Sequence, residues 1–164
     1  VHKEYLALVH GHPTWTRTEI DAPLGSREDS RIRIRQGVRS DGAPAATRVR
    51  TLERLSHGVA LSLVRCEPLH GRTHQIRVHL EHVGHPLLGD KMYGQPDHVF
   101  LHLLDHGPDE QVRSATSFPR QALHAHRLVL PHPDGTSLEI LAPLAPDMRS
   151  ILDGESPCWP LSGE

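Results

Sequence analysis

The chain has 164 residues, the length of one domain with enough chain for a hydrophobic core, and 37% of them are apolar. No run approaches the roughly 18 apolar residues of a membrane-spanning helix, and the opening residues are too polar-flanked for a signal peptide. The two cysteines, Cys66 and Cys158, exclude a disulfide framework and a paired-cysteine metal site, and we expect a soluble, cytoplasmic protein.

The formal net charge of −2 does not by itself indicate nucleic-acid binding, but the positive charge is unevenly distributed. Between Arg27 and Arg54 there are eight arginines against four acids, a local balance of +4. A basic stripe of this kind suits a phosphate backbone. The plainer explanation is a general bias in composition, because arginine outnumbers lysine 16 to 2 in the whole chain. Both explanations stay open on composition alone.

The first half of the chain predicts strands. "KEYLALVHG" (3–11) is apolar on both faces, and such a strand needs neighbours on both sides. "RIRIRQ" (31–36) alternates strictly and predicts a short strand with one basic face, while "DGAPAAT" (41–47) is a turn. Residues 47–66 predict a hairpin that turns at 56–58, with Val59, Leu61 and Leu63 alternating on its second strand.

The second half predicts loops, a hairpin and short helices. Residues 84–94 are rich in glycine and proline and predict a loop, and 95–119 predict a connection with some helix. Two strands, 121–130 and 136–143, flank a turn at 131–135, and "APDMRSIL" (145–152) predicts a short helix. We therefore expect an α+β fold on a mostly antiparallel sheet, with residues 1–154 as the domain and 155–164 as a flexible tail.

The stretch "GRTHQIRVH" (71–79) crowds two arginines, two histidines, a threonine and a glutamine into what reads as a helix start. With Thr73 as N-cap and about 100° of rotation per residue, Ile76, Leu80 and Val83 fall in one sector and form the buried stripe. Arg77 lies at the edge of this stripe, so its guanidinium is partly desolvated and needs an anionic partner.

The partner of Arg77 has two possible sources. Glu81, four residues on, can pair with it within the helix. The alternative is a carboxylate or phosphate from elsewhere, at a site. The helix start favours an anion as well, because its free N–H groups lie beside Arg72 and His74. The geometry alone leaves this choice open.

Residues 71–94, "GRTHQIRVHLEHVGHPLLGDKMYG", resemble the C-terminal hallmark of the RluA-type pseudouridine synthases, which isomerise uridine in ribosomal or transfer RNA. The resemblance extends upstream to "KEYLALVHG", similar to the family's strand with the active-site tyrosine, and to "DAPLG…GAPAATRVRTLERL". Downstream, "RQALHAHRLVLPHPDGTSLEILAPLAPDM" is similar to its closing strands. Only 95–119 and the tail lack a counterpart, so the resemblance implies part of the pseudouridine synthase catalytic-domain fold.

By position, the resemblance implies roles for particular residues. Tyr5 matches the tyrosine that packs on the target base and is a candidate for proton transfer, and Arg77 matches the arginine that pairs with the catalytic aspartate. The loop and helix start beside the RNA are matched by Arg72, Thr73, His74 and Gln75. The adjoining loop holds Asp90, Lys91 and Tyr93, with Asp90 expected to be mainly structural. The resemblance implies RNA as the partner and neither a cofactor nor a metal. We also expect the protein to be a monomer.

One part of the family pattern has no match here. The family's nucleophile is the aspartate of a His-Arg-Leu-Asp motif that precedes the tyrosine strand. The one His-Arg-Leu in this chain, 126–128, lies in the predicted closing strand and is followed by Val129. No aspartate here is assigned as nucleophile, so the chain alone is expected to be inactive. Two interpretations follow: a synthase whose upstream half holds the aspartate, or a non-catalytic RNA-binding remnant.

Two other classes of site are weak alternatives. His79, His82 and His85 recur every three residues, but the first two lie on the side of the helix away from Arg77, and nothing completes a metal-ligand set. A serine hydrolase is disfavoured because the chain has no Gly-x-Ser-x-Gly motif.

Overall fold

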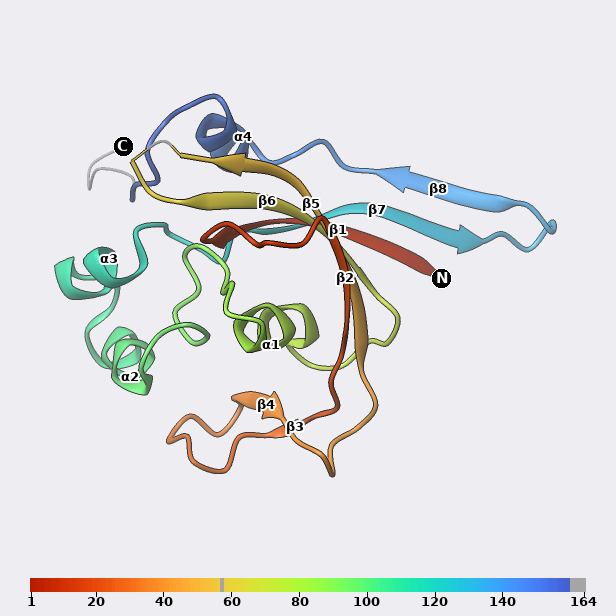
Figure 1. Ribbon diagram of the computed structural model, residues 1–164. Coiled ribbons are helices and arrows are strands. Elements are labelled where there is room, and N and C mark those ends of the chain that lie inside the picture. Colours follow the sequence, from red (N-terminus) through yellow and green to blue (C-terminus); the bar gives the residue numbers. More distant parts are fainter. Residues whose placement is uncertain (57, 160–164) are drawn as a thin grey trace.

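The computed structural model describes residues 1–56 and 58–159, and a six-stranded antiparallel sheet forms its centre (Figure 1). The order across this sheet is β2-β5-β6-β1-β7-β8. Its strands are β1 (His2–His10), β2 (Arg17–Asp21), β5 (Ala46–Leu55), β6 (Leu61–Pro68), β7 (Leu123–Pro131) and β8 (Ser137–Leu141). A small second sheet pairs β3 (Leu24–Ser26) with β4 (Gln36–Val38). The helices of the described residues are α1 (Gln75–His82), α2 (Asp97–His106), α3 (Glu110–Thr116) and α4 (Pro146–Leu152). This architecture confirms the predicted α+β class.

Strand β1 lies inside the sheet, between β6 and β7. Its segment from Leu6 to Val9 is buried, which is why the sequence is apolar on both faces there. The neighbours that such a strand requires come from later in the chain, with Tyr5 opposite Cys66 of β6. The strand ends at His10, and Gly11 follows it with a φ of 80°, in the left-handed region that favours glycine. The prediction for 3–11 is confirmed.

The two predicted hairpins are confirmed, with small differences. β5 and β6 pair as expected, but Val59 precedes β6 and is exposed, so the alternation begins only at Leu61. His57, in the predicted turn, lies outside the described residues. β7 and β8 form the closing hairpin, with the His-Arg-Leu triplet in β7, and the helix predicted for 145–152 is α4.

The prediction of a strand at 31–36 was wrong. Residues 31–35 form turns, and only Gln36 belongs to β4. Two of these residues point inward, Ile32 into the core and Arg35 toward Asp97 and Glu81, at 2.5 and 3.0 Å. The alternation therefore does not mark a strand: Ile32 and Arg35 are buried on a turn, whereas Ile34 is exposed.

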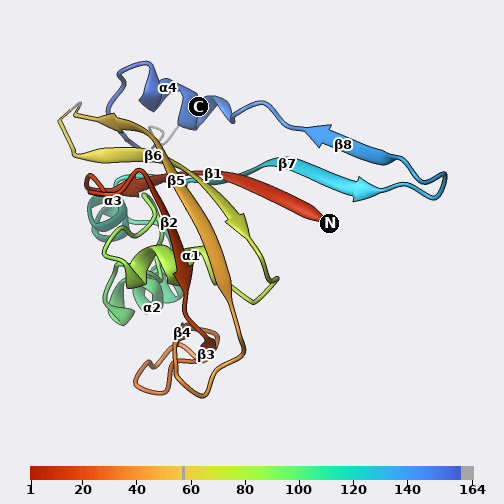
Figure 2. The same ribbon diagram turned by 45° about the vertical axis from the view of Figure 1, so that its right-hand side comes forward.

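The helices lie on both faces of the sheet (Figures 1 and 2). α1, α2 and α3 lie on one face, and α1 is enclosed between the large sheet and the β3–β4 hairpin, while α4 covers part of the other face. Two core clusters match these layers: Ala7 and Val64 pack with Leu80 of α1, and Leu8 and Leu63 pack on the side of Met148 of α4. None of the described helices has the length and apolar character needed to cross a membrane.

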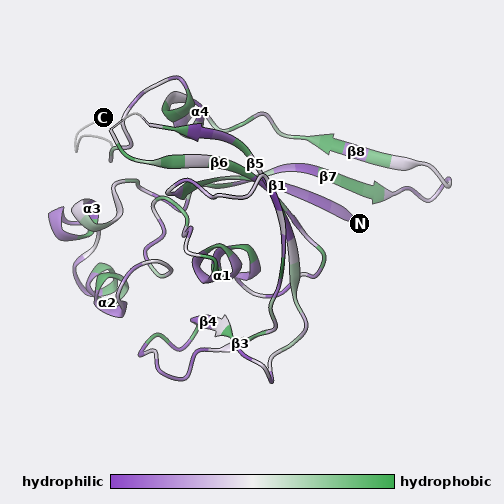
Figure 3. Ribbon diagram, in the orientation of Figure 1, coloured by the Kyte–Doolittle hydropathy of each residue, from purple (hydrophilic) through white to green (hydrophobic). Residues whose placement is uncertain are grey.

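The β7–β8 hairpin extends beyond the helical layers (Figures 1 and 2). β8 is an edge strand, and most of its ribbon has the hydrophobic colour in Figure 3. Its residues Leu138, Ile140 and Leu141 are exposed. At the C-terminus, Trp159 Nε1 donates to Thr116 Oγ1 at 3.3 Å. Residues 160–164 of the expected tail lie outside the described part of the chain.

Helix α1 is buried on more sides than the sequence predicted. Ile76 and Leu80 are buried as expected, Val83 only partly, and Val78 and His79 are buried in addition. The predicted stripe was too narrow because α1 contacts a second layer, the β3–β4 hairpin, as well as the sheet. His79 therefore belongs to the core, and both of its ring nitrogens are hydrogen-bonded within the protein.

His79 makes the stability of the fold depend on pH. Its Nε2–H donates to the carbonyl oxygen of Ala22 at 2.9 Å, and Nδ1 accepts from the hydroxyl of Thr47 at 2.8 Å. Burial lowers the pKa of His79 below its ordinary value of 6.5. The unfolded chain then binds more protons than the folded one between the lowered pKa and 6.5, so this stability is present above about pH 6.5 and is lost as the pH falls.

We expect the His79→Gln variant to show a weaker pH dependence of stability than the wild type. The free energy of unfolding, from urea titrations between about pH 7.5 and pH 5, should fall less steeply in the variant, by at most about 1.4 kcal/mol per pH unit for one proton. Burial lowers the pKa values of His10 and His74 too, so a residual slope should remain. Identical slopes in the two proteins would show that His79 is not the titrating group.

Candidate functional site at Tyr5 and Arg77

A pocket of about 270 Å³ opens where β1, the end of β6 and the start of α1 meet. Five of the six residues predicted for the site line it, which are Tyr5, Arg72, His74, Gln75 and Arg77. The exception is Thr73, which is exposed and outside this lining. The rest of the lining is Lys3, Pro68, His70, Gly71, Ile76 and Leu123. The fold thus places Tyr5 of β1 and the start of α1, seventy residues later in the chain, at the same pocket.

Arg77 is paired with Asp90, not with Glu81. Its Nε and Nη2 donate to the two carboxylate oxygens of Asp90 at 2.7 and 2.8 Å, a bidentate geometry. Glu81 instead accepts from Arg35 and from the backbone N–H of Gly94. The first alternative from the sequence was therefore wrong, and the partner is a carboxylate from elsewhere in the chain. Among the described residues, Arg77 Nη1 has no hydrogen-bond partner.

Asp90 is fixed by the loop that carries it. One of its carboxylate oxygens also accepts from the backbone N–H groups of Met92 and Tyr93, at 2.9 and 3.0 Å, and its side chain is completely buried. The ring of Tyr93 lies 4.7 Å from the Arg77 guanidinium carbon, within the range of a cation–π contact. Loop 87–94 therefore holds Arg77 from two sides, and Asp90, in this position, has a structural role.

The start of α1 differs from the sequence prediction. The N-cap is His74, not Thr73, and it adopts a left-handed conformation with φ of 56°, unusual for a residue other than glycine. Tyr93 Oη accepts from the N–H of Gln36 at 2.9 Å and is hydrogen-bonded to His74 Nδ1 at 2.8 Å, with the direction of this second bond set by the histidine tautomer. Burial, and then the positive charge of Arg77, lowers the pKa of His74. The ring is thus held neutral at the pocket wall.

Gln75 and Arg72 shape the loop before the helix. The amide nitrogen of Gln75 donates to the carbonyl oxygen of Ala46 and to Thr47 Oγ1, at 2.9 and 3.0 Å, and its amide oxygen accepts from the N–H of Arg72. Gln75 is buried, and all these bonds are internal to the protein. Arg72 is exposed and donates from Nε to the carbonyl oxygen of Pro44 at 3.1 Å. Of the two, Arg72 is the one available to a phosphate.

Tyr5 forms the opposite wall of the pocket. It is half-buried on the α1 side of β1, where it packs against the cluster that contains Ile76 and Leu80. Within the described part of the chain, its hydroxyl makes no hydrogen bond. An aromatic ring that is fixed on one side and open on the other can stack on a base.

No carboxylate lines this pocket within the described residues. Asp90 lies behind Arg77, and Glu4 alternates to the opposite face of β1, where it accepts from Arg127 at 2.5 Å. Across the described residues, one group of possible metal ligands occurs, His2, Glu4 and Glu67, also on that face. Burial raises the pKa of Glu4, but its hydrogen bond to Arg127 and the charge of Arg65 together help to lower it overall.

Asp90→Asn tests how strongly loop 87–94 supports Arg77. The change keeps the shape of the side chain but leaves the mostly buried guanidinium without its counter-charge, so we expect the free energy of unfolding to fall by about 2–4 kcal/mol. Asp147→Asn is the matched control, because its pair with Arg120 is more exposed and should contribute no more than about 1 kcal/mol. Equal losses for the two variants in urea unfolding would contradict a special role for Asp90.

The sequence and fold were compared with known proteins. A family model described as RNA pseudouridylate synthase matches residues 1–82. An uncharacterized RNA pseudouridine synthase of Chloroflexus aurantiacus is 43% identical over 151 residues, 92% of this chain and 41% of the relative. Ribosomal large subunit pseudouridine synthase D of Nitrosomonas europaea is 41% identical over 154 residues, 93% of this chain and 40% of the relative.

Solved structures give the same result. Human RNA Pseudouridylate Synthase Domain Containing 1 superposes with a TM-score of 0.69 at 30% identity, covering 99% of this chain and 62% of the other. The chain spans less than half of the length of the curated relatives above. Tyr5 and Arg77 line one pocket, and the RNA pseudouridylate synthase family model matches residues 1–82, half of the sequence. These observations lead to one conclusion. The chain belongs to the RNA pseudouridylate synthase family.

Proposed function

We propose that this chain forms the Tyr5–Arg77 part of the active site of an RNA pseudouridine synthase that modifies ribosomal or transfer RNA. The relative from Nitrosomonas europaea is named for the large ribosomal subunit, which favours ribosomal RNA. The observation that carries the proposal is the pocket itself, where an open aromatic ring faces an arginine whose remaining Nη1 is free to meet a second anion. We further propose that the protein acts as a monomer in the cytoplasm.

The reaction has to break the bond between N1 of uracil and C1′ of ribose, turn the base, and join C5 to C1′, while C5 loses a proton and N1 gains one. The target uridine must first leave the RNA stack, which costs roughly a few kcal/mol. Stacking on Tyr5 offsets about 1–3 kcal/mol of this cost. Arg72, exposed at the rim, binds a flanking phosphate, and the neutral His74 offers a hydrogen bond without adding charge.

The catalytic aspartate is supplied, in this proposal, by a segment outside residues 1–164. Arg77 would hold that carboxylate ionised and oriented, since an opposite charge within a few ångströms lowers the pKa of an acid by about 1–3 units. Asp90 is not proposed as the catalytic aspartate, because it is completely buried and already pairs with Arg77. In support, the curated relatives are more than twice as long as the matched region.

The exposed edge of the sheet also supports a further segment. β8 ends the sheet with unpaired backbone groups and exposes Leu138, Ile140 and Leu141. Soluble proteins normally cover or charge such an edge, because it otherwise pairs with other chains. A segment that packs against β8 would remove this exposure.

The second candidate function is an RNA-binding remnant of the same fold without catalysis. The absence of a carboxylate among the described pocket residues favours it, whereas the orientation of Arg77 by Asp90 favours the enzyme, since binding alone does not need a fixed guanidinium.

Analysis of the product distinguishes the two functions. The full protein, as its organism makes it, is incubated with unmodified ribosomal RNA, and the RNA is then digested to nucleosides and separated by chromatography. The proposal predicts a new nucleoside with the mass of uridine, produced in catalytic excess over the protein. RNA binding without this product would overturn the enzymatic function and leave the remnant.

A further inference from the structure

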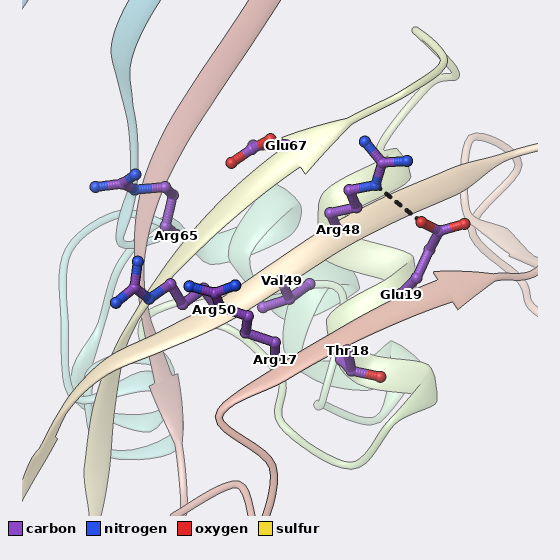
Figure 4. Close-up of a pocket in the computed structure, with 8 residues that line it drawn as sticks. All are labelled: Arg17, Thr18, Glu19, Arg48, Val49, Arg50, Arg65 and Glu67. Atoms are coloured by element: carbon purple, nitrogen blue, oxygen red, sulfur yellow. Dashed lines mark hydrogen bonds and ion pairs between the residues drawn. The ribbon is translucent and has the colours of Figure 1, made fainter.

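The face of the sheet opposite the Tyr5–Arg77 pocket carries a row of arginines. Arg17 of β2, Arg50 of β5 and Arg65 of β6 are directly opposite one another on three neighbouring strands. Figure 4 shows the three side chains grouped along one side of a shallow pocket of about 480 Å³. We call Arg17, Arg50 and Arg65 the arginine row.

The protein neutralises the row only in part. Like charges directly opposite one another on adjacent strands destabilise a sheet. Among the described residues, Arg17 and Arg50 have no carboxylate partner, and Arg65 has Glu4 at 3.4 Å while its own Nε is buried without a hydrogen-bond partner. Two carboxylates share the pocket. Glu19 lies on its far side and pairs with Arg48 at 2.9 Å (Figure 4). Glu67 lies two residues along β6 from Arg65 and makes no ion pair with the row within the described residues.

We propose that the arginine row binds consecutive phosphates of the RNA backbone, as a second contact surface outside the active site. Strands are about 4.8 Å apart, so the row extends roughly 10 Å, a length that suits a chain of phosphates better than one isolated anion. Guanidinium groups bind phosphate with two parallel hydrogen bonds. Among the described residues, no aromatic side chain lines this pocket, so the contact would be to the backbone and independent of sequence.

The position of the row suits RNA that is held in the Tyr5 pocket, and in this respect the inference rests on the proposed function. Arg65 is opposite Leu6 on β1, next to the Tyr5–Cys66 pair, so the row and the pocket lie back to back across one sheet. From Arg65 the row runs to β2, an edge strand. RNA that passes the end of β1 at Lys3 can thus keep a base at Tyr5 and lay its flanking backbone on the row.

The test uses fluorescence anisotropy with a labelled RNA hairpin of about 20 nucleotides that has a uridine-rich loop. Arg17→Gln with Arg50→Gln removes two contacts, whereas Arg17→Lys with Arg50→Lys keeps the positive charges. Each lost contact should weaken binding about fivefold at about 0.1 M salt and reduce the slope of log K against log[salt] by about 0.7. We expect about 25-fold weaker binding for the glutamine pair and a slope close to that of the wild type for the lysine pair.

Two controls make the result specific. Arg149→Gln removes one exposed arginine from α4 and should leave affinity and slope unchanged. The melting temperature of the glutamine pair should equal or exceed that of the wild type, because the change relieves repulsion between neighbouring charges. A folded glutamine pair that binds as tightly as the wild type would overturn the inference.

A further variant separates this inference from the proposed function. If Arg72→Gln weakens binding of the hairpin while the glutamine pair does not, the pocket binds RNA and the row does not. If the wild type fails to bind the hairpin even at low salt, both proposals fall. Weaker RNA binding by the Arg17→Gln, Arg50→Gln variant, together with binding retained by the Arg17→Lys, Arg50→Lys variant, supports RNA binding by the arginine row.

Discussion

Replacing Arg77 by alanine in the full protein is expected to all but abolish uridine isomerisation, with a loss of about 100- to 1000-fold in kcat. The physical reason is that Arg77 would orient and ionise the catalytic carboxylate, and loss of one preorganised electrostatic group typically costs 100- to 1000-fold. The measurement is a single-turnover assay at saturating RNA, which isolates chemistry from binding. Turnover near that of the wild type would show that Arg77 has no catalytic role.

Arg77→Ala also leaves Asp90 buried without its partner, so part of any loss could come from unfolding. Arg77→Lys answers this, because it keeps a positive charge beside Asp90 but lacks the planar fork that can hold two carboxylates at once. We expect the lysine variant to stay folded in circular dichroism and to bind RNA with nearly unchanged affinity. Its kcat should still fall by about 100-fold or more. A lysine variant with full activity would mean that charge alone is sufficient.

Replacing Tyr5 by alanine is the second large effect. The change removes a stacking surface worth about 1–3 kcal/mol and, if the hydroxyl transfers a proton, a further factor of about 100 or more. We expect a fall of several orders of magnitude in kcat/KM. Release of tritium from RNA labelled at C5 of uridine measures it, because that hydrogen leaves when C5 bonds to ribose. A mild effect would show that Tyr5 is not beside the target base.

Tyr5→Phe separates the two parts of this role. Phenylalanine keeps the ring on β1 and its packing against Ile76 but removes the hydroxyl, which makes no hydrogen bond within the described structure. If the hydroxyl transfers a proton, the phenylalanine variant should bind RNA normally and turn over slowly. Turnover equal to that of the wild type would assign Tyr5 to stacking alone.

Much of the fold could be predicted from the sequence, because its central elements have clear apolar patterns. β1 and the β5–β6 and β7–β8 hairpins carry alternating or continuous apolar runs bounded by turns. β2 was missed because its five residues bury only Ile20. The false strand at 31–36 arose because Arg35, on a turn, is buried by ion pairs with residues far along the chain.

The site was predictable only where its parts are close in sequence or match a family pattern. The 71–79 segment and Tyr5 meet at one pocket, as the resemblance implied. The pairing of Arg77 with Asp90 was not predicted, because it depends on how loop 87–94 folds back on α1. The arginine row could not be predicted from the sequence either. The strand register places Arg17, Arg50 and Arg65 together, and no spacing in the sequence indicates that register.

The most direct test of the account compares tritium release by two proteins on the same ribosomal RNA labelled at C5 of uridine. One is the full protein from its organism, and the other is the chain of residues 1–164 alone. We expect catalytic release by the full protein and none above background by the 164-residue chain, because the nucleophilic aspartate is proposed to lie outside residues 1–164. Release by the 164-residue chain would contradict the claim that the aspartate comes from outside it, and no release by the full protein would contradict the enzymatic function.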